Sequence, residues 1–317
     1  TNHRFLPGSP MQLLDKNIRE NIRNPLTPSI GNDSKVPLLS ANTIESELEQ
    51  TCKLAHAILK MQAGIKISVL VRSRNTYSEK LIGVMHEEGV SCFDGLFNDD
   101  DEEYIRFNEC CLDELDNLTE GINEINFSLL EKFVNGAEQA IDNGRFAHGA
   151  SYKQLLNGLL NQIKQEFAGA SQNLKYQYVR SVLENRSLRH TIDYIDVDVV
   201  VMTMHASKGL EWDYVILPEM IQWVSPAFAT CKDCMSLKAN EIRSNKCYFQ
   251  KSTEPQSFLD ELCLFYVAVT RARRSATFVM TTDRVNKGDE HKRGNLSCFA
   301  SLPGIQVFSP KSLQDII

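Results

Sequence analysis

The chain has 317 residues, of which 42% are hydrophobic and 24% charged, and its formal net charge is −7. The acidic balance excludes a protein that binds nucleic acid through overall positive charge, although a local basic groove stays open. No apolar run is long enough to span a bilayer and no signal peptide is recognisable, so we expect a cytoplasmic protein with no membrane contact. The first residue, Thr1, indicates a fragment or a processed product.

The first 97 residues alternate predicted helices and strands. Helices are predicted over residues 11–22, 43–61 and 76–88. Strands are predicted over 36–39, 65–71 and 90–93, of which 65–71 is expected to be buried. Asn42 is the expected cap of the second helix. Because strands and helices alternate, the fold class we expect is α/β, with a parallel sheet flanked by helices.

An acidic loop at residues 98–103 marks a change of character. From there to residue 192 leucines recur at helical spacing and no strand is convincing, which predicts an all-helical insertion over 98–192. Near its end, basic residues alternate with tyrosines, a pattern that can contact nucleic acid. We favour the structural interpretation, a solvated helix face with buried tyrosines. The residues concerned are Lys175, Tyr176, Tyr178, Arg180, Arg186, Arg189 and His190.

The stretch VVVMTMHASKGLEWDYVILP, residues 199–218, is the centre of the second α/β part, residues 193–317. Two apolar runs, 199–204 and 214–217, predict buried strands on either side of a polar crossover. Ligands of open α/β sheets bind outside the carboxyl ends of the strands, so we expect His205, Lys208 and Glu211 to emerge at that edge.

The remaining chain predicts an irregular segment, a helix and a strand. The segment is 221–255, the helix is 257–273 with Ser257 and Asp260 in capping positions, and the strand is 276–281. Cys231, Cys234, Cys247 and Cys263 raise the alternative of a zinc site. Cys263 is expected to be buried in the apolar helix, which leaves three ligands where four are usual, so no metal site is predicted.

Two strings resemble motifs of UvrD/Rep-type DNA helicases. TMHASKGLEW, residues 203–212, resembles motif V, and ELCLFYVAVTRAR, residues 261–273, resembles motif VI. Asn2-His3-Arg4 is a short match to motif IV, with His3 where the family has tyrosine. The resemblance implies a second RecA-like motor domain formed by residues 1–97 and 193–317. The helical insertion then stands where the family carries its accessory domain, 2B, in a shorter form.

The resemblance also implies roles for single residues. Arg271 matches the arginine that reaches the γ-phosphate of ATP, and Arg4 matches a second such arginine. Glu211, with Gly209 before it, matches the nucleotide site, where the glutamate accepts from the ribose. The residues that match single-stranded DNA contacts are Thr203, His205 and Lys208.

Each of these assignments has a structural alternative. Arg271 could be a cation at a helix C-terminus, Glu211 a turn cap, and His205 a satisfied core histidine. The run Asp260 to Phe265 also departs from the Glu-Glu-Arg-Arg-Leu-Phe that family members often show, which puts side contacts there in doubt.

The chain has no Gly-x-x-x-x-Gly-Lys-Ser/Thr string and no strand ending in Asp-Glu. ATP and Mg²⁺ would therefore be held mainly by an N-terminal RecA-like half, and we expect this chain alone not to hydrolyse ATP. The implied whole is an ATP-dependent 3′–5′ DNA helicase with a role in DNA repair, whose partners are single-stranded DNA and a separate nuclease or repair protein. The alternatives are a non-enzymatic DNA- or partner-binding module, or the helicase component of an anti-phage helicase–nuclease.

Overall fold

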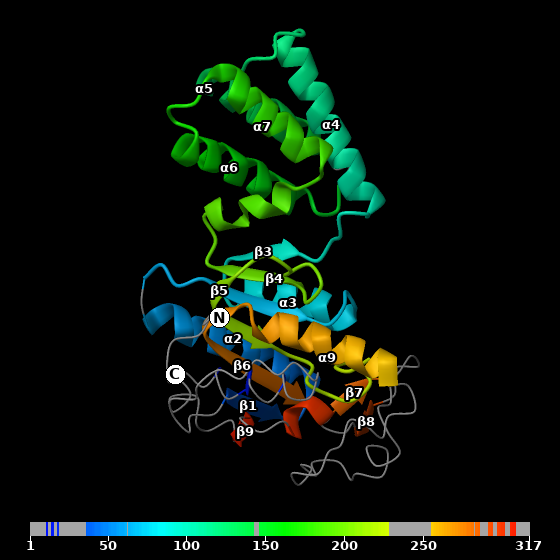
Figure 1. Ribbon diagram of the computed structural model, residues 1–317. Coiled ribbons are helices and arrows are strands. Elements are labelled where there is room, and N and C mark those ends of the chain that lie inside the picture. The colour runs from blue at the N-terminus through cyan, green and yellow to red at the C-terminus, as the bar shows by residue number, and fades with distance from the viewer. Residues whose placement is uncertain are drawn as a thin grey trace. The chain divides into compact units, whose positions relative to one another are not determined.

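The computed structural model divides the chain into two compact units. The first unit combines Thr1–Cys92 with Asp198–Ile317, and the second is Phe93–Val197. Figure 1 shows the elements of both. The residues that the structure describes are Met11, Leu14, Asp15, Ile18, 36–61, 63–142, 146–227, 255–281, 283–285, 291–293, 297–301 and 305–308.

The first unit is built on a parallel sheet. Its strands lie in the order β4-β2-β5-β6-β1-β9, and each neighbouring pair in this series is parallel. The predicted α/β class with a RecA-like parallel sheet is confirmed. The bounds are β1 (Val36–Ala41), β2 (Ile67–Val71), β4 (Val199–Thr203), β5 (Trp212–Leu217), β6 (Ala272–Thr281) and β9 (Ile305–Phe308). A separate antiparallel pair joins β7 (Asp283–Val285) to β8 (His291–Arg293).

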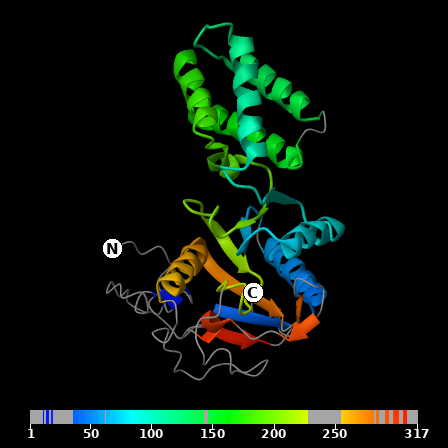
Figure 2. The same ribbon diagram turned by 90° about the vertical axis from the view of Figure 1, so that its right-hand side faces the viewer.

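The inner strands are hydrophobic on both faces because helices cover both sides of the sheet. Every residue of β2 and β4 is buried, and the two strands pair in register from Ile67 with Val199 to Val71 with Thr203. Figure 2 shows α9 (Pro255–Val269) on one face and α2 (Ile44–Met61) with α3 (Thr76–Glu87) on the other.

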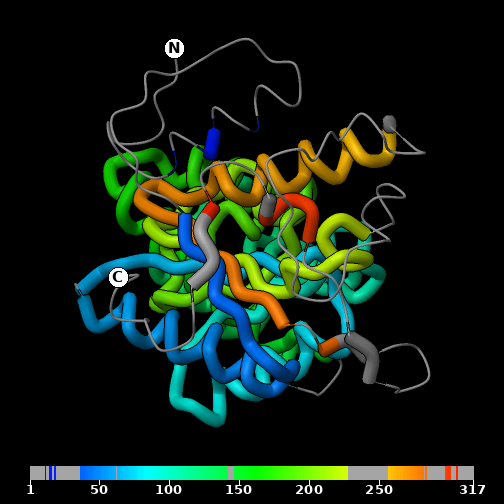
Figure 3. Tube along the Cα trace, turned by 90° about the horizontal axis from the view of Figure 1, so that it is seen from below, coloured from blue at the N-terminus to red at the C-terminus, as the bar shows by residue number. Residues whose placement is uncertain are grey.

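Strands that are far apart in the sequence lie together at the β9 end of the sheet. β1 pairs with β6 on one side, where Leu38 is opposite Phe278, and with β9 on the other, where Val36 is opposite Ile305. Figure 3 shows the three strands side by side.

Helix beginnings differ from the sequence prediction where a different side chain makes the capping bond. Thr43 Oγ1 accepts from Ser46 N at 3.1 Å, so Thr43 rather than Asn42 caps α2. α9 begins at Pro255, which places Ser257 and Asp260 inside the helix rather than at its cap. The first residue of a helix suits proline because its missing N–H has no helical partner there.

The end of α9 is the main correction to the predicted elements. The helix was expected to reach residue 273, but it ends at Val269 and β6 already begins at Ala272. Trp212 N donates to Arg271 O at 2.9 Å, and Trp212 then pairs with Ala272. Pairing with β5 therefore pulls the chain out of the helix two residues after Val269.

The second unit is helical, apart from the end of β3 (Cys92–Gly95), the strand in which the first unit ends and the second begins. Its described helices are α4 (Glu102–Thr119), α5 (Phe127–Asp142), α6 (Gly149–Glu166), α7 (Gln172–Glu184) and the 3₁₀ helix η1 (Leu188–Tyr194). Packed aromatic rings form much of its core. Phe107 stacks on Tyr152 with ring centroids 4.4 Å apart, and Phe97 meets Tyr104 at 5.1 Å.

Three basic residues near the end of the second unit contact other residues of that unit. Lys175 is 6% exposed, with its Nζ 4.1 Å from the centroid of the Phe127 ring. Arg189 is 8% exposed and lies over the ring of Phe97 at 4.8 Å, and Arg180 pairs with Asp116 at 2.5 Å. Tyr176 is 5% exposed, as the structural interpretation expects, but Lys175 and Arg189 are buried, so the expected solvated helix face is wrong for these two residues. Within the described ranges, no helix is both long enough and apolar enough to cross a membrane.

Candidate nucleotide and DNA sites

The turn that follows β4 is closed by its own short side chains. Thr203 Oγ1 accepts from Ala206 N at 3.2 Å, and Ser207 Oγ donates to Met204 O at 2.7 Å. Thr203 is 7% exposed and Ser207 is fully buried. Val71 O, at the end of β2, accepts from Met204 N at 2.8 Å. Thr203, expected to contact DNA, is thus the residue that closes this turn.

The other predicted residues of the turn face solvent. His205, Lys208 and Gly209 are all exposed, so the alternative of a core histidine at position 205 is wrong. Gly209 has φ +90°, a conformation that side-chain-bearing residues rarely adopt, and a Cβ there would meet no atom within 4 Å. The glycine is needed for the backbone turn rather than for close packing.

A ladder of three hydrogen bonds leads from the end of β4 to the start of β6. Ser207 N donates to Thr203 O at 3.2 Å, and Leu210 N donates to Ser207 O at 3.1 Å. Arg271 Nη1 then donates to Leu210 O at 3.1 Å. We call this series the Thr203–Arg271 ladder.

The two ends of the Thr203–Arg271 ladder lie at opposite edges of the sheet. Thr203 is the last residue of β4, whereas Glu211 immediately precedes β5 and Arg271 immediately precedes β6. Because β4, β2, β5 and β6 are parallel, the chain must cross to the other edge before β5 can begin. The expectation that Glu211 emerges with His205 at the carboxyl edge is wrong, and Glu211 lies at the amino edge with Arg271.

Arg271 joins the end of α9 to the polar crossover. Its guanidinium donates from Nε to Val267 O at 3.0 Å and from Nη1 to Leu210 O at 3.1 Å, and the residue is 7% exposed. The Val267 carbonyl belongs to the last turn of α9, where a cation is favoured by the helix dipole. The backbone bond from Trp212 N to Arg271 O fixes the residue on its other side.

Glu211 forms an ion pair with Arg273 beside that backbone bond. Glu211 Oε2 lies 3.7 Å from Arg273 Nε, and the two side chains are 37% and 52% exposed. A pair at this distance and exposure adds little stability. Glu211 and Arg271 are therefore brought together at the amino edge, as an exposed acceptor beside a buried donor fork.

Comparison with known proteins identifies the family to which the chain belongs. A family model described as the UvrD-like helicase C-terminal domain matches residues 114–283, which is more than half of the 317 residues. The chain belongs to the UvrD-like helicase C-terminal domain family. The matched range includes both resembling motifs.

Two individual proteins are similar to this UvrD-like domain. An ATP-dependent helicase/nuclease subunit of Staphylococcus haemolyticus (strain JCSC1435) is 27% identical over 177 residues, which cover 50% of this chain and 14% of that protein. The crystal structure of the C-terminal domain of a possible DNA helicase from Lactobacillus plantarum WCFS1 superposes with a TM-score of 0.38 and 12% identity. That superposition covers 96% of this chain and 98% of the other.

At the carboxyl edge of the UvrD-like domain, a largely buried ion pair joins three segments that the sequence analysis did not connect. Arg72, directly after β2, donates from Nε to Glu261 Oε2 at 3.0 Å and from Nη2 to Glu261 Oε1. The same Oε2 accepts from Ala227 N at 3.2 Å, and the Glu261 side chain is 10% exposed. The sequence held one signal for this pair, the polar residue Arg72 directly after a buried strand.

Two buried carboxyl groups lie at the same edge. Glu47, on α2, accepts from Glu219 N at 2.7 Å through Oε1, and Glu219 follows β5. Burial raises the pKa of Glu47 to about 8, with the charge of Glu219 adding to the increase. Burial also raises the pKa of Glu219 to about 7, although the hydrogen bond from the Asn75 amide lowers it in part. At neutral pH both groups are thus partly or mostly protonated.

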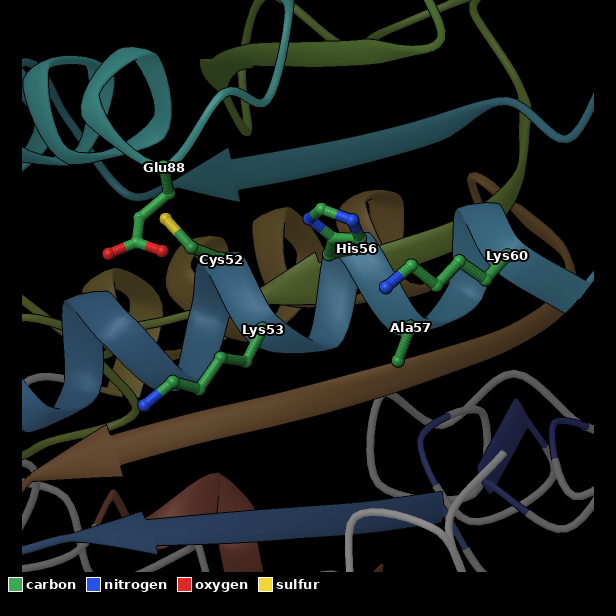
Figure 4. Close-up of a pocket in the computed structure, with 6 residues that line it drawn as sticks. All are labelled: Cys52, Lys53, His56, Ala57, Lys60 and Glu88. Atoms are coloured by element: carbon green, nitrogen blue, oxygen red, sulfur yellow. The ribbon is translucent and has the colours of Figure 1, made fainter.

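A shallow groove of about 260 Å³ lies along α2 and contains none of the predicted site residues. Figure 4 shows its lining, in which Glu88 stands beside Cys52 and the other side chains, Lys53, His56, Ala57 and Lys60, come from α2. Burial raises the pKa of Cys52 to about 11, and the carboxylates of Glu88 and Glu49 add to the increase. The Cys52 thiol stays protonated at neutral pH, so the groove offers no thiolate.

Arg4 and the cysteines Cys231, Cys234 and Cys247 lie outside the described residues. Cys263, expected to be buried, is exposed on α9. It falls on the outer side of that helix, whereas its neighbours Leu262 and Leu264 are buried. In the part of the chain that the structure describes, no group of three or more His, Cys, Asp or Glu residues could hold a metal ion.

Proposed function

We propose that this UvrD-like domain is the C-terminal motor half of an ATP-dependent 3′–5′ DNA helicase or translocase. The observation that supports the proposal is the meeting of Glu211 and Arg271 where β5 and β6 begin. These are two of the residues that the motif resemblance assigns to the nucleotide, and they lie 60 positions apart in the sequence.

At the nucleotide, Glu211 and Arg271 have different tasks. The Glu211 carboxylate is acceptor-only and half-exposed, which suits the hydroxyls of a ribose. Arg271 is always charged and offers a planar fork of donors, which suits the γ-phosphate. Its Nη2 donates to Thr270 Oγ1 at 3.4 Å, a weak contact that a phosphate oxygen can replace, so we assign the phosphate contact to this nitrogen. Arg4 is proposed as a second phosphate-binding arginine.

At the DNA, the exposed part of the β4 turn is the proposed contact surface. Lys208 and His205 provide a cation and an imidazole for phosphates and bases, and Thr203 fixes the turn that presents them. ATP and Mg²⁺ are proposed to be held mainly by an N-terminal RecA-like half.

Steady-state ATP hydrolysis by the complete product of the gene, with and without single-stranded DNA, tests the proposal. We expect DNA-stimulated turnover that falls about 10³-fold or more in Arg271→Ala. Because Arg271 also bonds Leu210 O and Val267 O, Arg271→Lys and a thermal melt of each variant are needed to separate lost catalysis from lost folding. Unchanged turnover in a folded Arg271→Ala variant would contradict the assignment.

Glu211→Gln gives a second, independent readout. A ribose contact is made equally in the ground state and the transition state, so its loss raises KM for ATP and leaves kcat nearly unchanged. Asp213→Asn is the matched control, because Asp213 lies at the same edge but bonds Lys66 N at 3.0 Å. If neither substitution at position 211 nor at 271 affects nucleotide turnover, a non-enzymatic DNA- or partner-binding module becomes the better description.

A helicase–nuclease complex is the second candidate, because the staphylococcal relative is a helicase/nuclease subunit. In that case the nuclease is proposed to be another chain or another part of the gene product. Cleavage of labelled DNA by the complete product, alone and with proteins that co-purify with it, tests this candidate.

A further inference from the structure

The segment that follows β5 presents an exposed tryptophan. Trp223 is 43% exposed, while Met220, Ile221 and Gln222 on one side and Ser225 on the other are all less than a twentieth exposed. Trp223 also has φ +75°, in the region that bulky residues avoid. An unfavourable conformation of an exposed aromatic residue persists only where the surrounding backbone imposes it, and such positions concentrate at functional sites.

The backbone around Trp223 is tied to the rest of the first unit. Met220 N donates to Val279 O at 3.2 Å, and Met220 O accepts from Ser297 N at 3.0 Å. On the far side, Ser225 N donates to Ile221 O at 3.0 Å, and Ser297 Oγ donates to Ser225 O. The backbone that carries the indole is therefore fixed, which lowers the entropy lost when a ligand packs against the ring.

The loop after β2 runs alongside this segment. Asn75 Nδ2 donates to Glu219 Oε1 at 3.3 Å, and Glu261 links Arg72 to Ala227 N. These two contacts bracket Arg74, whose side chain is 50% exposed and only loosely paired with Glu79 at 3.7 Å. A cation that is free to take another anionic partner thus lies on the loop next to the tryptophan segment.

The turn after β4 adds a third exposed side chain, His205, to the edge that carries Arg74 and Trp223. The bond from Met204 N to Val71 O places the residue before His205 against the end of β2. Since β4, β2 and β5 are neighbours in the sheet and parallel, their carboxyl ends lie in sequence along one edge. His205, Arg74 and Trp223 follow these three ends in that order.

We propose that Trp223 is a stacking platform for an unpaired base of single-stranded DNA. Arg74 and His205 hold the sugar-phosphate backbone along the same edge. The inference rests on the proposed DNA-binding function and adds a residue that lies outside both resembling motifs. A π-face on the same edge as a guanidinium and an imidazole suits single strands, because every base can stack on an indole while phosphates bond to the two polar groups. The exposed side chains argued to share this edge with Trp223 are His205 and Arg74, an imidazole and a cation, which favours a nucleic acid over an apolar protein surface.

The chain offers a direct optical test because it has two tryptophans. Trp212 is 2% exposed and Trp223 is 43% exposed, so a base can quench only Trp223 by stacking. The full 317-residue chain is titrated with oligo(dT) while tryptophan emission is followed, and anisotropy of a fluorescein-labelled oligo(dT) gives the affinity independently.

Three variants separate stacking from folding. Trp223→Gly removes the ring at a φ that glycine favours, so the fold is expected to persist. Trp223→Phe keeps a smaller π-face, and Leu174→Ala removes an apolar side chain of similar exposure, 48%, on α7. We expect saturable quenching in the unaltered chain, about tenfold weaker binding in Trp223→Gly, an intermediate loss in Trp223→Phe, and no change in Leu174→Ala.

Two outcomes would overturn the inference, and only one of them also contradicts the proposed DNA-binding function. Binding by anisotropy with unchanged emission and unchanged affinity in Trp223→Gly refutes the stacking role but leaves the proposed function standing. An absence of oligo(dT) binding in the unaltered chain refutes both the stacking role and the DNA-contact part of the proposed function.

Discussion

Glu47 is the residue whose environment departs most from water among the described carboxyl groups of the first unit. Its pKa is about 8 in the folded chain because burial disfavours the charged form, while an unfolded chain has the ordinary value of 4.5. A folded-state pKa above the unfolded value means that the folded chain binds the proton more tightly. This contribution to stability is complete below pH 4.5 and is lost as the pH rises towards 8.

Replacement of Glu47 by Gln is therefore expected to stabilise the chain at high pH. Glutamine keeps an oxygen to accept from Glu219 N but has no charge to bury. The difference in unfolding free energy, variant minus unaltered chain, should rise by more than about 1 kcal/mol between pH 5 and pH 8. Urea denaturation at both pH values measures it. Glu49→Gln, on the exposed face of the same helix, is the control and should show no such rise.

At the scale of elements, one glycine in each unit shows how packing decides whether a Gly→Ala substitution stabilises or destabilises the chain. A Cβ at Gly158, on α6, would lie 2.7 Å from Thr191 O and 2.9 Å from Ile195 Cγ2. A Cβ at Gly83, on α3, would meet no atom within 4 Å. Gly158 thus lets η1 approach α6, whereas Gly83 has no packing role.

Opposite effects are therefore expected for two Gly→Ala substitutions. Gly83→Ala gains helix propensity and should stabilise by up to about 1 kcal/mol. Gly158→Ala gains the same propensity but forces η1 away from α6, with a net loss of about 1–3 kcal/mol. Denaturant midpoints compared with the unaltered chain measure both, and a stable Gly158→Ala variant would show that α6 and η1 can separate at no cost.

The Arg72–Glu261 pair joins β2, α9 and the segment around Ala227, so its loss should affect more than one element. Removing one partner leaves a buried charge without its counter-ion, which costs about 3–5 kcal/mol in comparable pairs. We expect this loss for Arg72→Met and for Glu261→Leu, and a much smaller loss for the double variant. A double-mutant cycle by urea denaturation gives the coupling, and strictly additive losses would contradict it.

The sequence predicted these elements best where one local pattern decides them. The β-branched runs of β2 and β4 are buried on both faces, and their strands appear within two residues of the expected bounds. The end of α9 could not be predicted, because the bond from Trp212 N to Arg271 O joins segments that are distant in the sequence. Arg72 with Glu261, 189 positions apart, and the exposure of Trp223 depend on tertiary packing in the same way.

At the scale of the whole molecule, an acidic chain with a net charge of −7 is proposed to bind a polyanion. The affinity must then come from few local cations, of which Lys208 and Arg74 are exposed at the carboxyl edge. Each phosphate neutralised on a single strand contributes about −0.7 to the slope of log K against log salt.

A shallow salt dependence of oligo(dT) binding is the expected result, with a slope of about −1.4 from these two contacts. Lys208→Gln and Arg74→Gln should each reduce its magnitude by about 0.7. Lys164→Gln changes the net charge equally but lies in the second unit, paired with Glu131, and should leave the slope unchanged. Anisotropy titrations at several salt concentrations measure the slopes, and equal effects of all three substitutions would indicate a response to net charge alone.

The Thr203–Arg271 ladder also has a thermodynamic consequence. One end closes the turn proposed to meet DNA, and the other ends on the guanidinium proposed to meet ATP. If Arg271 releases Leu210 O when nucleotide binds, the turn loses a restraint in the same step. Any factor by which nucleotide changes the affinity for DNA must then equal the factor by which DNA changes the affinity for nucleotide. Through the short crossover of residues 203–211, binding of nucleotide at the amino edge would then change DNA binding at the carboxyl edge, and the reverse.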